Sequence, residues 1–231
     1  MTKSTTGVFC FVLLVFITAC GAGNSTVAHE TSDSWAGYAS AGGRGRYMHV
    51  SASWVQPALN CSRTPFAHAE FWAGLDGWGS DTVEQTGIDA DCSYGTPIYQ
   101  AWYQLWPKRK VWYSNVVNPG DKISASVTAD GNGHFILNLV DSRERWTHRK
   151  PATFRRARLV SAEVIVEAPA YTQGDPLTLS DFGTVSFTGT SANGESLVSG
   201  LRQIDMVHRG ILKAAPSPMS NGGFTVTWKH S

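Results

Sequence analysis

Apolar and polar residues alternate with a period of two through much of the chain. Segments 48–54 (MHVSASW), 121–129 (DKISASVTA), 134–140 (HFILNLV) and 224–228 (FTVTW) each place apolar side chains on one face and polar side chains on the other. Such alternation is typical of half-buried antiparallel strands. Turn sequences such as NPGD, ADGNG, SANGE and MSNGG separate the segments, and we find no amphipathic helical pattern. The pattern predicts an all-β chain folded as a single-domain β-sandwich.

The N-terminal segment has a different pattern. Lys3 precedes an apolar run, Val8–Ala19, which suits a signal peptide and is too short to span a bilayer as a helix. The run ends in ITAC, which resembles a bacterial lipobox, so we predict a signal peptide over residues 1–19 and lipidation of Cys20. One lipid anchor would tether the protein to a membrane surface without spanning it. Ordinary cleavage and free secretion is the alternative.

Composition limits the possible roles of the chain beyond the signal peptide. Residues 20–34 are polar and predict a flexible linker, and residues 35–231 are enough for one sizeable domain. The formal net charge of +1 gives no reason to expect a nucleic-acid partner, and we expect a monomer. Once Cys20 is lipidated, Cys61 and Cys92 remain as an isolated pair, which in an exported protein predicts a disulfide. No histidine lies at ligand spacing beside either cysteine, so no metal site is predicted.

Several kinds of catalytic centre are excluded by missing motifs. The chain has no G-x-S-x-G nucleophile motif, no H-E-x-x-H zinc motif and no Walker glycine loop. It has neither D-T-G nor D-S-G, which excludes a pepsin-like pair of aspartates. No cofactor is predicted. The remaining candidates are polar side chains on strands.

Those polar side chains gather on single faces of four predicted strands, because alternate residues of a strand point the same way. Tryptophans share these faces, which indicates a concave binding surface rather than a solvated outer sheet. Glu84 points to the opposite face of its strand. The grouped residues are Trp72, Gly74 and Asp76; Gln85, Gly87 and Asp89; Gln100, Trp102, Gln104 and Trp106; and Glu163, Ile165 and Glu167.

The segments FWAGLDG, VEQTGIDADC, YQAWYQLWP, SAEVIVEAP and DFGTVSF together resemble the eqolisins, which are glutamic peptidases. The upstream WAGYAS and ASWVQP and the final FTVTWK agree, so the resemblance runs in order from Trp35 to Lys229. It implies a concanavalin-like sandwich of two antiparallel, about seven-stranded sheets with a concave substrate groove. It also implies an exported endopeptidase that acts on polypeptide substrates through a glutamine and a glutamate.

Carried over residue by residue, the glutamine of the Q-T-G motif is Gln85 and the glutamate of the A-E-x-I-V-E motif is Glu163. Glu163 as a carboxylate would deprotonate the attacking water and return the proton to the leaving amine. Gln85 cannot take a proton, but its amide can donate to the developing oxyanion and its carbonyl oxygen can hold the water. The predicted substrate-binding residues are Trp72, Asp76, Asp89, Gln100, Trp102 and Gln104.

The chain departs from the family pattern at Gln100 and Gln104, where members often carry Asp and Glu. Fewer like charges near Glu163 remove one cause of a raised pKa at this carboxyl. From the replaced carboxylates and the near-zero net charge, we expect an activity optimum nearer neutrality than in acid-secreted relatives.

A basic segment runs from Arg143 to Arg158, where seven Arg and Lys residues accompany one acid, Glu144. We interpret it as a solvated loop or an edge strand protected by charge. A patch for anionic cell-envelope polymers or acidic substrate segments is the alternative.

Two other functions stay open at this stage. One is a non-catalytic sandwich that binds peptide or glycan through its tryptophan-lined groove. The other is a glycosidase, which needs two carboxylates facing one groove. Glu163 with Asp76 or Asp89 would supply them, but Gln85 would then have no essential role.

Overall fold

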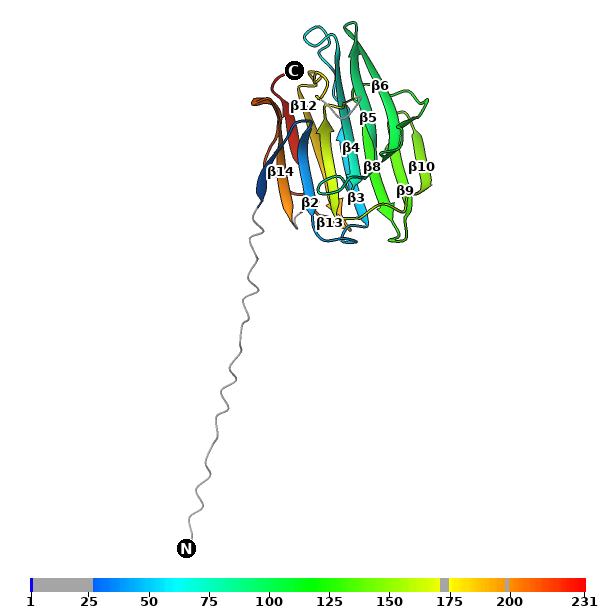
Figure 1. The fold of residues 1–231 in the computed structure, drawn as a ribbon, viewed down its shortest axis with the longest axis vertical. Coiled ribbons are helices and arrows are strands. Elements are labelled where there is room, and N and C mark those ends of the chain that lie inside the picture. Colours follow the sequence, from blue (N-terminus) through cyan, green and yellow to red (C-terminus); the bar gives the residue numbers. More distant parts are fainter. Residues whose placement is uncertain (2–26, 171–174, 198–199) are drawn as a thin grey trace.

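The computed structural model describes residues 1, 27–170, 175–197 and 200–231 (Figure 1). Most of the predicted signal peptide, and Cys20 with it, lies outside the described residues. In the described part of the chain the regular elements are 16 strands, and no helix there is long and apolar enough to cross a membrane. The predicted all-β fold is confirmed.

The strands form one hydrogen-bonded path that folds back on itself into two packed layers. The outer layer has the order β10 (Trp146–Thr153), β9 (His134–Asp141), β8 (Lys122–Ala129), β3 (His49–Val55), β12 (Thr184–Ala192) and β16 (Phe224–Trp228). The groove layer has the order β14 (Leu201–His208), β2 (Trp35–Ala41), β11 (Ser161–Glu167), β4 (Ala67–Leu75), β5 (Val83–Ser93), β6 (Thr96–Trp106) and β7 (Val111–Trp112). β15 (Ile211–Pro216) joins the two layers, and β13 (Glu195–Ser196) pairs with β12.

The hydrophobic core lies between the layers. On β3 and β8 the apolar positions of the alternating pattern, such as Val50, Trp54 and Val127, are buried. The polar positions face solvent, where Ser53 and Ser124 share a hydrogen bond of 2.8 Å between their hydroxyls. Each large apolar side chain that is fully buried contributes about 1.5–3 kcal/mol, so the alternation fixes which face of each strand turns inward.

The domain begins earlier than the sequence predicts. The linker is predicted to extend to residue 34, but Ala28–Ser32 forms strand β1, which pairs in parallel with β14. Its sequence, AHETS, carries no apolar alternation because the strand lies at the surface, with every second residue exposed. An ion pair of 2.6 Å between Glu30 and Arg202 supports the pairing.

The predicted disulfide between Cys61 and Cys92 is confirmed. It ties the loop after β3 to the end of β5. Both cysteines are buried and form a small apolar cluster with Ala67, against which Leu59 packs. The bond therefore holds the far end of the groove strands against the outer layer.

Replacing Cys61 and Cys92 together by alanine is expected to lower the free energy of unfolding by about 3–4 kcal/mol. The bond joins residues 31 positions apart, and its loss returns conformational freedom to the unfolded chain. Urea unfolding of parent and variant, each with and without reductant, measures the difference. Equal stability of oxidised parent and variant would contradict the expectation.

Candidate active site

The groove layer arranges side chains from four strands in transverse rows. β11 pairs with β4, β4 with β5 and β5 with β6, each in antiparallel and unbroken register. Residues directly opposite one another across such strands point to the same side of the sheet. Three successive rows face away from the core and form the groove.

The first row contains Glu163, Gly74, Gln85 and Gln104. A Cβ atom at Gly74 would lie 3.0 Å from the Cβ of Gln85, so the glycine keeps this part of the row open. Adjacent strands lie about 4.8 Å apart, which separates the Cα atoms of Glu163 and Gln85 by about 10 Å. The two predicted catalytic side chains therefore stand on either side of a residue without a side chain.

The second row contains Ile165, Trp72, Gly87 and Trp102. Both tryptophans are fully buried. A Cβ at Gly87 would lie 2.1 Å from the carbonyl oxygen of Phe71, so only glycine allows β4 and β5 to approach here. The row is a rigid apolar layer next to the first row.

Other side chains cover these tryptophans. The ring of Trp35 meets Trp72 edge-on at 5.1 Å, and the ammonium of Lys110 lies 4.2 Å from the centre of the Trp102 ring. The indole N–H of Trp72 donates to Glu167 at 2.9 Å. Trp72 and Trp102, both predicted to bind substrate, thus form the floor beneath the exposed surface of the groove.

The third row contains three carboxyl groups, of Glu167, Glu70 and Asp89, followed by Gln100. Like charges on neighbouring strands repel, and Lys110 offsets this by pairing with Glu70 and lying 3.3 Å from Asp89. Burial, and then the charge of Glu70, raises the pKa of Asp89 well above its ordinary value. The same causes raise the pKa of Glu167 to about 8. At neutral pH this row therefore keeps part of its carboxyls protonated.

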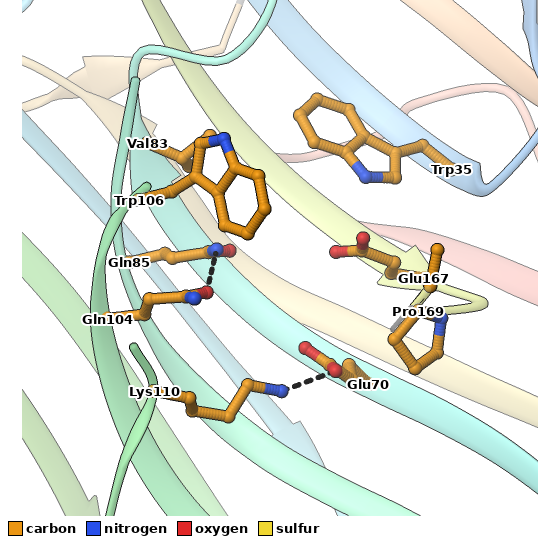
Figure 2. A pocket seen from close by; sticks show the side chains of 10 residues that line it. Trp35, Glu70, Val83, Gln85, Gln104, Trp106, Lys110, Glu167 and Pro169 are labelled. Atoms are coloured by element: carbon orange, nitrogen blue, oxygen red, sulfur yellow. Dashed lines mark hydrogen bonds and ion pairs between the residues drawn. The ribbon is translucent and has the colours of Figure 1, made fainter. Parts of the chain in front are cut away.

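A cavity of about 300 Å³ opens over these rows (Figure 2). Figure 2 shows Gln85, Gln104 and Lys110 on one side of it, with Trp35 and Glu167 on the other. Concave sites of this kind bind ligands through apolar walls and a few placed polar groups. Within the described ranges, no group of three or more His, Cys, Asp or Glu residues is placed to hold a metal ion.

Glu163 is fully buried, at 0% exposure, beneath the loop that follows β4. Its Oε1 accepts the backbone N–H of Trp78 at 3.1 Å, and its Oε2 has no partner among the described residues. Burial raises the pKa of Glu163 well above its ordinary value, and the nearby Asp76 adds to the rise. The neutral amides in the groove remove one cause of a raised pKa, but burial outweighs their effect. The carboxyl therefore ionises at a higher pH than a free glutamate.

Gln85 has its amide oriented by a short relay of hydrogen bonds. Its NH₂ group donates to Oε1 of Gln104 at 3.1 Å, and the NH₂ of Gln104 donates to the carbonyl oxygen of Lys108 at 2.9 Å. The buried Oε1 of Gln85 has no partner in the described part of the chain. One N–H of the Gln85 amide also remains for another acceptor. Gln104, predicted to contact substrate, here sets which way the Gln85 amide points.

Asp76 lies elsewhere than the alternation predicts. β4 ends at Leu75 and Asp76 has a φ of 64°, so the alternation stops before it. Its fully buried carboxylate accepts the backbone N–H groups of residues 158–160 at 2.7–2.8 Å. Asp76 therefore anchors the loop that leads into β11 and Glu163, and it is not a substrate contact.

Glu84 is a second buried carboxyl behind the first row. It faces the inner side of the sheet at 0% exposure, and neither of its oxygens has a partner among the residues described. Burial, with the nearby carboxyls of Asp76 and Glu163 adding to its effect, raises the pKa of Glu84 to about 9. The group is therefore a neutral acid at and below neutral pH, close to the carboxylate of Asp76.

Replacing Glu84 by glutamine is expected to make unfolding less sensitive to alkaline pH. Because the pKa of Glu84 is raised on folding from 4.5 to about 9, the stability tied to its proton is full below pH 4.5 and is lost as pH rises through 9. Glutamine has nearly the same shape as glutamate and does not titrate. Near pH 9 the variant should exceed the parent by about 1 kcal/mol or more, with no gain near pH 4. Urea unfolding at both pH values tests this, and a pH-independent difference would contradict it.

Comparison with known proteins identifies the family. The model of the peptidase A4 family matches residues 33–228. The chain belongs to the peptidase A4 family. Its predicted resemblance to the eqolisins is thereby confirmed, and so is the prediction that it is a peptide hydrolase with a polypeptide substrate.

Individual relatives of the A4 family agree. Aspergillopepsin-2 from Aspergillus niger is 27% identical, over 73% of this chain and 67% of the relative. The crystal structure of scytalido-glutamic peptidase with a transition state analog inhibitor is similar with a TM-score of 0.74 at 22% identity, over 86% of this chain and 99% of the other. Aspergilloglutamic peptidase from Aspergillus niger gives a TM-score of 0.62 at 24% identity, over 71% and 99%. The solved structures confirm the β-sandwich fold.

Four ionisable residues that line or support the site were not among the predicted site residues. Glu70 shares the face of Trp72 by strand alternation, and Glu167 shares that of Glu163, so both were within reach of the sequence pattern. Lys110 lies in the connection before β7 and carries no periodic signal. For Glu84 the signal was strand alternation, which turns this glutamate toward the inner face of its strand, where a carboxyl is unusual.

Proposed function

We propose that this A4 peptidase is an exported endopeptidase in which Glu163 is the general base and Gln85 binds the water and the oxyanion. The observation that carries the proposal is the first row: the two side chains face each other across Gly74, and each keeps one buried oxygen without a partner among the described residues. Gln85 lines a cavity that reaches the surface. Family membership supplies the reaction class, hydrolysis of a peptide bond.

In the proposed mechanism the attacking water is held by one oxygen of each side chain. Oε2 of Glu163 and Oε1 of Gln85 are both acceptors, and one water molecule has two O–H groups to donate. Glu163 takes one proton while the oxygen of the water bonds to the carbonyl carbon of the substrate. As the C–N bond breaks, the same proton passes from Glu163 to the leaving amine.

Negative charge develops on the substrate carbonyl oxygen during the attack. The remaining N–H of the Gln85 amide donates to it, and the hydrogen bond to Gln104 fixes the amide before substrate arrives. A donor that needs no reorientation stabilises the transition state more than it stabilises the ground state.

The pH dependence follows from the buried base. Because burial raises the pKa of Glu163 well above its ordinary value, the carboxylate needed for catalysis is lost as pH falls through that raised pKa, before pH 4.5 is reached. We therefore expect activity to rise with pH through the weakly acidic range, toward a maximum nearer neutrality. A profile that peaks below about pH 3, under the reference pKa of glutamate, would contradict this expectation.

The direct test is digestion of an unfolded protein substrate by the purified protein from pH 2 to pH 8. Mass spectrometry of the fragments distinguishes internal cleavage from trimming of the ends. Pepstatin should not inhibit, since the chain has no D-T-G or D-S-G motif. Absence of cleavage at every pH would overturn the proposal and leave a peptide-binding sandwich as the function.

Export is part of the proposal. It is supported by the apolar run at Val8–Ala19 and by the Cys61–Cys92 disulfide, which forms in oxidising compartments. A mature chain that starts at a lipid-modified Cys20 would be membrane-tethered, and a chain cleaved later would be secreted. The intact mass of the protein recovered from the membrane and medium fractions separates these two forms.

The glycosidase alternative loses its second carboxylate in the structure. Asp76 is fully buried and occupied by the N–H groups of residues 158–160. Asp89 is paired with Lys110 and lies in the third row, away from Glu163. The arrangement around Glu163 instead pairs a carboxyl with an amide, which suits hydrolysis of a peptide bond.

A further inference from the structure

Three arginines line a second cleft, outside the groove, at the end of the sandwich where β3 begins. Arg44 comes from the connection between β2 and β3, and Arg155 and Arg158 come from the connection between β10 and β11. Together with the turn at residues 131–133 they border a cavity of about 310 Å³. We call this site the arginine cleft. It uses part of the basic segment that the proposed peptidase mechanism leaves unexplained.

The positive charge of the arginine cleft is not neutralised within the described ranges. None of its three arginines forms an ion pair there, and none of the described residues that line it is acidic. The neighbouring Arg156 differs, because it lies 3.4 Å from Asp81. Asp130 directly precedes the turn that borders the cleft, but its carboxylate is hydrogen-bonded to the backbone of that turn and to the side chain of His134.

The walls of the cleft are held together by backbone hydrogen bonds. The N–H of Gly45 donates to the carbonyl oxygen of Arg158 at 2.9 Å, which ties the Arg44 loop to the second wall. The N–H of Phe154 donates to Gly133 at 2.8 Å, which ties the turn to the residue before Arg155. Asp76 accepts the N–H of Arg158 at 2.7 Å. The three guanidinium groups therefore extend from fixed backbone, and ordering the loops is not required for binding.

We propose that the arginine cleft binds a phosphate group. The guanidinium group matches the oxygens of phosphate with paired N–H donors, and it stays charged at every pH at which the protein is folded. Three such groups around one cavity, without an acid on its described lining, suit a compact anion with several acceptor oxygens. A phosphodiester also keeps its charge in weakly acidic solution, where carboxylates begin to take up protons.

The phosphate has two possible sources, a lipid headgroup or free phosphate. The position of the cleft points to the headgroup. The first residue of β1 pairs with Arg202 of β14, and Arg202 pairs with Ala39 near the end of β2. The Arg44 loop follows that end of β2. The chain therefore enters the domain at the same end of the sandwich as the arginine cleft. This is the lower end in Figure 1. Cys20, the predicted lipidation site, precedes Val27 by seven residues, which span at most about 25 Å.

The test compares the parent with Arg44→Gln/Arg155→Gln/Arg158→Gln. The control is Arg145→Gln/Arg149→Gln/Lys150→Gln, which removes the same amount of charge from β10 and the turn before it. Every protein carries Cys20→Ser, so that no acyl group holds it on vesicles. The probes are inorganic phosphate, followed by the shift in melting temperature, and vesicles of phosphatidylcholine with or without phosphatidylglycerol, followed by co-sedimentation.

We expect phosphate or phosphatidylglycerol vesicles to bind the parent and the control. The arginine-cleft variant should bind roughly 100-fold more weakly, since each arginine near an anionic surface contributes about five-fold. Binding of vesicles alone identifies the headgroup as the source, and binding of inorganic phosphate identifies a site for the free anion. Failure of both probes to bind the parent, or equal weakening in both variants, would overturn the proposal. Peptidase activity should be the same in all three proteins.

Discussion

Glu163→Gln is expected to lower kcat for peptide hydrolysis by about 10³–10⁴-fold, toward the upper end of what a general base contributes. Glutamine has nearly the same shape, and its carbonyl oxygen can still accept the N–H of Trp78 that now bonds to Oε1. It cannot take a proton from water. Initial rates on a fluorogenic peptide, measured near the optimum of the parent, give the ratio.

Glu167→Gln is the matched control for this change. Glu167 lies on the same strand and the same face, is partly buried, and has a pKa raised to about 8. It accepts the indole N–H of Trp72, which a glutamine oxygen can still do. We expect less than about a ten-fold loss of kcat, because this carboxyl stands two rows away from Gln85. Hydrolysis that survives in Glu163→Gln would show that another group is the base.

Gln85→Ala is expected to lower kcat by about 10²–10³-fold, the usual effect of removing one oxyanion donor. KM should change little, since the hydrogen bond in question strengthens only as charge develops on the substrate oxygen. Steady-state kinetics on the same peptide separate the two parameters. The alanine side chain also leaves Oε1 of Gln104 without its donor, so urea unfolding is needed to show that the variant is folded.

Gln100→Ala provides the comparison. Gln100 lies on the groove face of β6, in the third row, where it pairs with Asp89 and not with Gln85. A substrate contact there would raise KM and leave kcat nearly unchanged. If Gln85→Ala shows that same signature, Gln85 binds substrate and does not stabilise the transition state.

Strand alternation predicted much of the groove because β4, β5 and β11 keep a period of two without a bulge. The sequence placed Glu163, Gln85 and Trp72 each on the grouped face of its strand. The register of the sheet puts Glu163 and Gln85 in the first row and Trp72 in the second. The same reasoning correctly turned Glu84 away from that face. The family resemblance supplied what alternation cannot, namely that these faces line one substrate groove.

The remaining features depend on contacts between residues far apart in the sequence. Asp76 left the predicted face because its positive φ ends the strand, and its partners are the N–H groups of residues 158–160. Lys110 lies in a connection, where no periodicity reports direction. The pKa of Glu163 was predicted from the number of nearby charges, whereas burial dominates it. Glu163 is buried because the loop that follows β4 folds over it, and no local sequence pattern predicts that contact.

Strand β1 gives the domain a mechanical property. It pairs in parallel with β14 over Ala28–Ser32, and the chain enters it from one end. A pull on the chain at Val27 along the axis of β1 loads these hydrogen bonds together, in shear, instead of opening them one after another. Force applied at Val27 is thus taken up by the pairing of β1 with β14, and β2 lies between β14 and β11, which carries Glu163.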